Sequence, residues 1–61
     1  MNWDVIRDHL DDVVYALEAI KHEASSFGSL EKDVYSTIDG VVLTVTSFKE
    51  LTYWLQKVEP K

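Results

Sequence analysis

The stretch DVYSTIDGVVLTVTS, residues 33–47, decides the fold. Two runs rich in β-branched residues, 34–38 and 41–45, flank the dipeptide Asp39-Gly40. A two-residue type I′ turn needs positive φ at both central positions, and Asp-Gly is among the sequences that adopt it most readily. We therefore predict a two-stranded antiparallel hairpin in which Gly40 has a positive φ.

An alternative interpretation makes SLEKDVYSTID, residues 29–39, a helix. Leu30, Val34 and Ile38 are then spaced at i, i+4 and i+8, and Gly40 is its end signal. This alternative gives a mostly α protein with three helices. We prefer the hairpin, because the alternative leaves VVLTVT, residues 41–46, as a strand without a partner in the chain.

Before this stretch, WDVIRDHLDDVVYALEAIKHE, residues 3–23, has the pattern of one long helix. Asn2 is a favourable N-cap and Asp4 complements the helix dipole in the first turn. Gly28 can take the left-handed conformation past the helix end. Apolar residues recur in steps of three and four, and we call them the predicted seam, either a core or a dimer interface: Trp3, Ile6, Leu10, Val13, Leu17, Ile20, Ala24 and Phe27.

After the hairpin, Ser47 and Glu50 have capping-box spacing and predict the start of a C-terminal helix. Pro60 is expected to end it. Its predicted buried stripe consists of Phe48, Leu51, Leu55 and Val58, widened by Trp54. The expected fold class is therefore α+β, with a long N-terminal helix, a hairpin and a C-terminal helix in one small domain, residues 1–61.

The chain of 61 residues is short for a self-sufficient core, since such a chain buries only about 60% of its unfolded surface. Small domains compensate with disulfides, a structural metal or association, and this chain has no cysteine and only two histidines. We therefore expect a homodimer. The lack of cysteine favours a cytoplasmic location. Asp4 and Asp8 interrupt the segment where a signal peptide would be positively charged and then apolar.

The net charge of −5 is concentrated in the first part of the chain. Residues 1–28 carry six acids and two basic residues, giving −4, whereas residues 29–61 carry five acids and four lysines, giving −1. Direct binding to nucleic acid or to an anionic membrane needs clustered Lys and Arg. The sequence therefore predicts no direct nucleic-acid or membrane partner, and it favours a larger protein with a basic surface.

The acids of the first helix lie nearly opposite the predicted seam, and Tyr15 lies among them. No lysine stands four residues after the first four of these acids to pair with them, and Asp8 is repelled by like charges on both sides. An exposed tyrosine among carboxylates is typical of a binding anchor. We name the candidate partner-binding residues the acidic band: Asp4, Asp8, Asp11, Asp12, Tyr15 and Glu18.

The sequence carries no pattern that indicates catalysis. There is no cysteine nucleophile, no serine lies in a Gly-x-Ser-x-Gly turn, and FGSLEK, residues 27–32, has too few glycines for a phosphate-binding loop. His9 and His22 are each spaced to share a helix face with a carboxylate, but a zinc site needs three or four converging ligands. We expect both to be solvated, and we predict no enzyme activity, metal or cofactor.

The pattern favours a small acidic, non-enzymatic protein–protein interaction module, a regulator or inhibitor that binds through the acidic band. It resembles in type the small phage and bacterial regulators that bind a larger protein. One alternative is a self-associating structural or assembly protein. Another is a DNA mimic. A single helix offers one carboxylate per about 4 to 5 Å, against one charge per about 1.7 Å in duplex DNA, so such a mimic would have to be a dimer.

Overall fold

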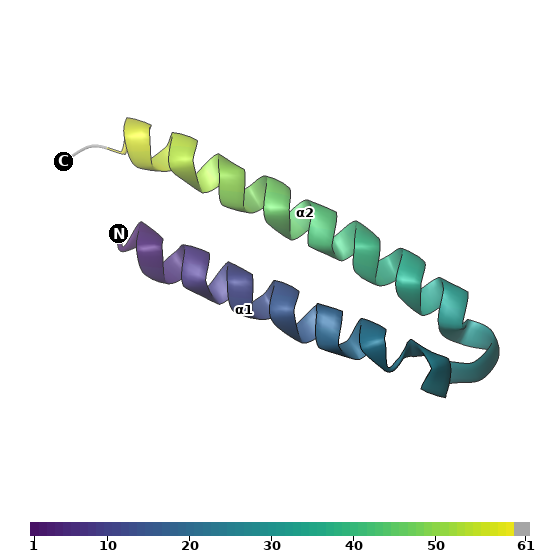
Figure 1. Ribbon diagram of the computed structural model, residues 1–61. Coiled ribbons are helices and arrows are strands. Elements are labelled where there is room, and N and C mark those ends of the chain that lie inside the picture. The colour runs from purple at the N-terminus through teal and green to yellow at the C-terminus, as the bar shows by residue number, and fades with distance from the viewer. Residues whose placement is uncertain (60–61) are drawn as a thin grey trace.

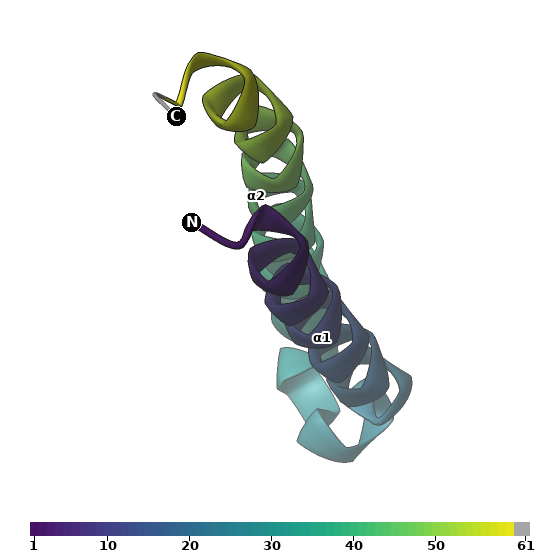
Figure 2. The same cartoon turned by 90° about the vertical axis from the view of Figure 1, so that its left-hand side faces the viewer.

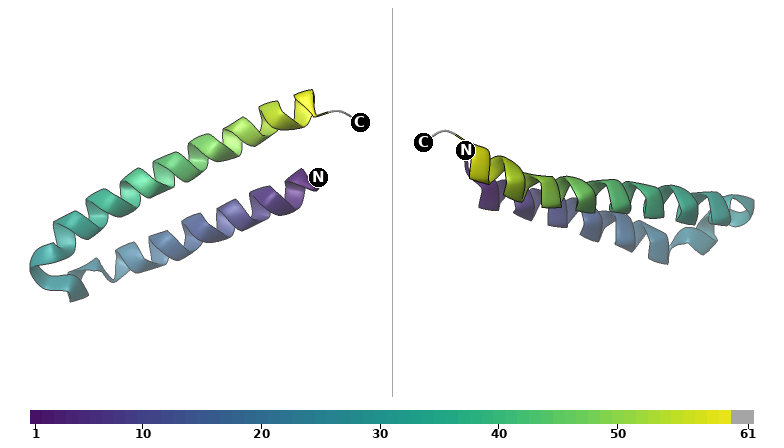
Figure 3. Two further views of the ribbon diagram at one scale, coloured as in Figure 1. Left: turned by 180° about the vertical axis from the view of Figure 1, so that it is seen from behind. Right: turned by 90° about the horizontal axis from the view of Figure 1, so that it is seen from above.

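Two long helices and a short connecting segment make up nearly all of the part of the chain that the structure describes (Figure 1). The computed structural model describes residues 1–59, with α1 at Trp3–His22, the 3₁₀ segment η1 at Ala24–Leu30 and α2 at Glu31–Val58. The helices run antiparallel, so the start of α1 and the end of α2 lie together and η1 lies at the opposite end (Figure 1). The molecule measures 51 × 16 × 9 Å. It is a single layer of two helices, as the views in Figures 2 and 3 show.

The predicted hairpin is wrong, and with it the α+β fold class and the predicted order of helix, hairpin and helix. Residues 1–59 contain two α-helices and no strand, and α2 runs without interruption through Asp39 and Gly40. Gly40 does not have a positive φ. Ser47 lies inside α2 and caps nothing. The three-helix alternative assigned helix to residues 29–39, of which residues 31–39 belong to α2, but its end at Gly40 is wrong.

Packing against α1 explains why residues 33–47 are helical. On a continuous helix Val34, Ile38, Val42 and Val45 fall on one side, and their side chains are buried or half-buried. Helix propensity and β-propensity are weak preferences that such packing overrides, and a glycine inside a helix costs only about 1 kcal/mol. The hydroxyl of the β-branched Thr44 donates to the Gly40 carbonyl at 3.0 Å, so it is hydrogen-bonded within the helix.

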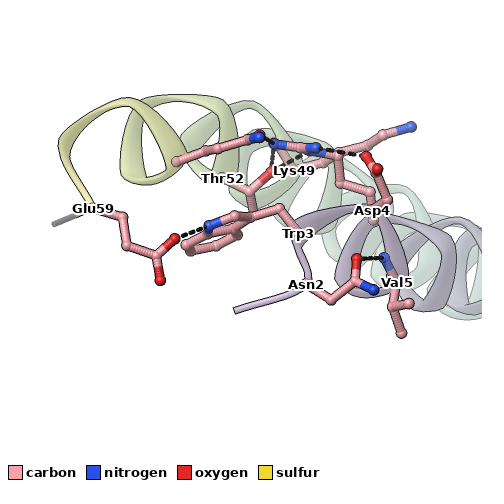
Figure 4. A network of polar contacts seen from close by, with 9 residues as sticks. Asn2, Trp3, Asp4, Val5, Lys49, Thr52 and Glu59 are labelled. Carbon is pink, nitrogen blue, oxygen red and sulfur yellow. Dashed lines mark hydrogen bonds and ion pairs between the residues drawn. The ribbon is translucent and has the colours of Figure 1, made fainter. Parts of the chain in front are cut away.

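The N-terminal helix forms as predicted. The Asn2 side chain accepts a hydrogen bond from the Val5 amide at 3.3 Å and caps α1 (Figure 4). Gly28 has φ +61° and ψ −124°, a conformation that side chains resist, so this glycine allows the turn between the helices. At the other end, α2 stops at Val58. Pro60, the predicted stop signal, lies outside the described residues.

The seam between the helices is narrow. Most of the less exposed residues recur in steps of three and four on both helices, as in a coiled coil. On α1 and η1 they are Trp3, Arg7, Leu10, Val14, Leu17, Lys21 and Ala24; on α2 they are Val34, Ile38, Val42, Val45, Lys49 and Thr52. Of the apolar residues described, only Ala24 and Ile38 are buried. The two antiparallel helices, which we call the helical hairpin, therefore have very little core of their own.

The two glycines give a test of the backbone. An added methyl group at Gly40 meets nothing within 4 Å, so Gly40→Ala is expected to raise the free energy of unfolding by about 0.5–1 kcal/mol. Gly28→Ala is expected to lower it by about 1–3 kcal/mol, because alanine resists the positive φ. Urea unfolding of both variants at one protein concentration checks this. A destabilised Gly40→Ala variant would contradict a continuous α2.

Candidate interaction surfaces

The structure divides the predicted seam between two sides of α1. Its members Trp3, Leu10 and Leu17 are half-buried, at the positions that α2 covers, and Ala24 is fully buried. Ile6 is half-buried at the edge of that contact. The remaining members are about half exposed and have no helix over them: Val13, Ile20 and Phe27.

A second apolar stripe follows α2 and is missing from the sequence-based prediction. Positions 30, 34, 37, 41, 44, 48, 51, 55 and 58 again alternate in steps of four and three, and none of them carries a charge. Six large side chains of this stripe are substantially exposed: Leu30, Val41, Phe48, Leu51, Leu55 and Val58. The prediction that the last four are buried is therefore wrong for the single chain.

Both stripes lie on the same broad side of the hairpin. One stripe consists of Val13, Ile20 and Phe27, and the other follows α2. Successive residues of a helix are about 100° apart around its axis. By this measure each stripe lies about 80–100° around its helix axis from the residues that face the other helix, and the sense of rotation is the same on both helices. Because the helices are antiparallel, equal rotations of this kind point to the same side. We call the nine exposed residues Val13, Ile20, Phe27, Leu30, Val41, Phe48, Leu51, Leu55 and Val58 the apolar face. Within residues 1–59 no third element covers it (Figure 3).

The acidic band lies on the side of α1 nearly opposite the apolar face, and the structure separates its members. Asp8, Asp12 and Tyr15 are exposed, Tyr15 at 79%, and neither aspartate forms an ion pair with another described residue. Asp4 is exposed and contacts the Arg7 guanidinium at 3.3 Å. These four residues therefore remain accessible to a partner.

The other two members of the band face the second helix. Asp11 accepts a hydrogen bond from the Lys49 ammonium at 2.7 Å. Glu18 is half-buried beside Lys21 and Tyr35, in a hollow of about 240 Å³ that also borders His22. Asp4 and Asp11 are paired with basic side chains, which reduces the net negative charge of the band. Its charge density is therefore even lower than a DNA mimic requires.

Two ion pairs hold the helices in register. Lys49 pairs with Asp11, and Lys21 donates to Asp39 at 2.7 Å. In each pair the hydrogen bond to the carboxylate raises the pKa of the lysine, which keeps it charged. Both pairs are partly exposed, so they contribute more to alignment than to stability.

A polar layer interrupts the seam at Arg7. The guanidinium is buried, donates through Nε to the Thr52 hydroxyl at 3.0 Å, and lies 3.9 Å from the centre of the Tyr53 ring. It also donates to Gln56. This role of Arg7 was not predicted from the sequence, although Arg7 stands between Trp3 and Leu10 in steps of four and three. A buried arginine with specific partners fixes which residues of the two helices face each other.

A contact between Trp3 and Glu59 closes the open end of the hairpin (Figure 4). The Trp3 indole N–H donates to the Glu59 carboxylate, and the terminal amine lies 3.4 Å from the same group. The hydrogen bond from Trp3 is the main cause that lowers the pKa of Glu59 below its usual 4.5, and the positive amine adds to it. This contact therefore depends on an ionised carboxylate.

At acidic pH the contact between Trp3 and Glu59 is expected to weaken. A carboxylate whose pKa is lowered by folding stabilises the protein above its unfolded pKa, and that stabilisation is lost as the pH falls through the folded pKa. The melting temperature of the wild type should therefore fall below pH 4.5 more steeply than that of Glu59→Gln. Glu50→Gln, at an exposed site on α2, is the control and should follow the wild type. Parallel curves for all three proteins would contradict this role of Glu59.

The described residues show no constellation typical of a metal site or a membrane span. Both histidines, His9 and His22, are exposed, and residues 1–59 contain no group of three potential ligands that could hold a metal ion. Neither helix has the length and apolar content needed to cross a membrane. Comparison with protein-family models, curated proteins and solved structures finds no match to this chain.

Proposed function

We propose that this chain is a non-enzymatic protein–protein interaction module whose main contact surface is the apolar face. One observation carries the proposal: nine large apolar side chains on one side of a two-helix layer are about half exposed. A monomer rarely exposes a contiguous apolar patch of more than about 300–600 Å², and larger patches mark interaction sites. A cytoplasmic location belongs to this proposal and is supported by the absence of cysteine.

Photo-crosslinking at two leucines of α2 tests the contact surface. A photoreactive amino acid replaces Leu51 on the apolar face or, as the control, Leu43, which is 68% exposed on another side. In a lysate of source cells we expect a protein crosslinked at position 51, either a copy of this chain or another protein. Position 43 should give little product. Equal products at both positions, or none at position 51, would contradict the proposal.

A second candidate function is recognition of a larger basic protein, as a regulator or inhibitor, through the acidic band. The exposure of Tyr15 at 79%, beside the unpaired Asp8 and Asp12, favours it. An aromatic side chain among accessible charges is a common anchor at protein interfaces. The purely structural alternative, self-association alone, does not need these residues.

Charge reversal separates the two candidates. Asp8→Lys places a positive charge between Asp4 and Asp12, so folding should be unchanged or slightly improved. Capture of a basic protein from lysate should fall by about tenfold or more and should weaken with added salt. Glu50→Lys makes the same change of charge on α2 and should bind as the wild type does. Undiminished capture by Asp8→Lys would leave the acidic band as a solvated surface only.

A further inference from the structure

We propose that the apolar face is covered by a second copy of this chain, so that two hairpins form a four-helix bundle. This inference rests on the proposed function and names its partner. The four observations that support it are the exposed area, the spacing of the stripes, the distribution of charge and the small internal core.

The exposed area matches what a stable dimer requires. The chain exposes 4874 Å², whereas a compact monomer of 7.0 kDa is expected to expose about 4000 Å². The nine half-exposed side chains of the apolar face, each with a full area on the order of 150–200 Å², offer on the order of 800 Å². A specific interface buries about 800 Å² on each partner.

The spacing of the stripes fits another pair of the same helices. The apolar stripe of α2 repeats in steps of four and three over positions 30–58, the spacing of the seam that already joins α2 to α1. That spacing is the signature of helices that pack along their full length. A second hairpin supplies helices of equal length and equal repeat, and two hairpins meeting face to face give the four-helix bundle arrangement.

The charges also favour a second copy over other partners. The stripe on α2 has no charged residue, and the acidic band of α1 points away from it. Two copies can therefore join without bringing their net charges of −5 into direct contact. This face has no lysine that could bind an anionic membrane. The carboxylates that could bind a basic protein lie on the other side.

The internal core gives the reason for association. Ala24 and Ile38 are the only buried apolar residues among those described, and no disulfide is possible without cysteine. Chains of this size usually need a staple or an oligomer to fold stably. We infer that burial of the apolar face supplies most of the core, so that folding and dimerisation are coupled.

Sedimentation equilibrium of the purified full chain, from micromolar to millimolar concentration, tests this inference. The wild type should have twice the mass of 7.0 kDa. Leu51→Asp should raise the dissociation constant by about a hundredfold or more, because a two-fold interface contains the change twice. Leu43→Asp makes the same substitution on the same helix away from the apolar face, and it should remain a dimer.

A second measurement covers the case in which Leu51→Asp fails to fold. The melting temperature of the wild type should rise with protein concentration, since only the folded dimer gains from association. A helical wild type of 7.0 kDa at all concentrations, a melting temperature independent of concentration, or equal dissociation by both aspartate variants would overturn the second-copy inference. A foreign protein crosslinked at position 51 would then still support the proposed function, whereas no crosslink would refute both.

Discussion

Ile38→Ala is expected to remove a large part of the stability of the folded chain. Ile38 is 6% exposed and is the largest buried apolar side chain of α2. Replacing a buried isoleucine by alanine costs about 2–5 kcal/mol. At about 0.05–0.15 kcal/mol per residue, the whole chain has only about 3–9 kcal/mol of stability. Circular dichroism and urea unfolding at a fixed protein concentration measure the loss.

Leu43→Ala is the matched control for this prediction. Leu43 lies on the same helix, is 68% exposed and belongs neither to the seam nor to the apolar face. Substitutions at such surface sites usually change stability by less than about 0.5 kcal/mol. A loss at Leu43 equal to that at Ile38 would show that the assignment of buried and exposed sides of α2 is wrong.

Arg7→Glu is expected to destabilise the protein by about 3–5 kcal/mol, the cost of leaving a buried charge without its partner. The Arg7 guanidinium donates to the Thr52 hydroxyl and contacts Asp4, and it is buried over the Tyr53 ring. A carboxylate at this position cannot donate these hydrogen bonds and is repelled by Asp4. Urea unfolding of the variant measures the loss.

Arg7→Met separates the effect of the charge from that of the volume. Methionine is apolar and of similar length, and replacing buried ionic groups by apolar ones is often neutral or stabilising. The Thr52 hydroxyl still donates to the Lys49 carbonyl, so it is not left unpaired. We expect a change of less than about 1 kcal/mol. If Arg7→Met were as unstable as Arg7→Glu, the polar layer itself would be essential to stability.

Those parts of the fold that depend on local signals could be predicted from the sequence. Asn2 caps α1 and the apolar repeat of residues 3–20 forms a helix. Each of these features depends on residues within a few positions of one another. The acidic band was visible for the same reason, since its members share one helix face.

The secondary structure of residues 33–47 could not be predicted, because this stretch satisfies two patterns at once. Its apolar residues alternate as in a strand and also recur in steps of three and four as in a helix. Asp39-Gly40 is a strong local turn signal, but a glycine inside a helix costs only about 1 kcal/mol. The packing of α2 against α1 outweighs it, and that packing involves residues far apart in the sequence.

The candidate surfaces were only partly predictable for the same reason. The engagement of Asp11 depends on Lys49, and the second apolar stripe exists only if α2 is continuous through Gly40. In the sequence-based prediction that stripe is divided between a β-hairpin and a helix. Four of the nine residues of the apolar face were therefore assigned to a buried core that the single chain does not have.

The solvent exposure of two leucine side chains tests most directly whether the apolar face is covered. In the isolated hairpin Leu51 is 48% exposed and Leu43 is 68% exposed, so a soluble paramagnetic probe would broaden the methyl NMR signals of both. In the wild-type protein at millimolar concentration we predict strong broadening at Leu43 and little at Leu51. Comparable broadening at the two residues would contradict an apolar face buried in an interface.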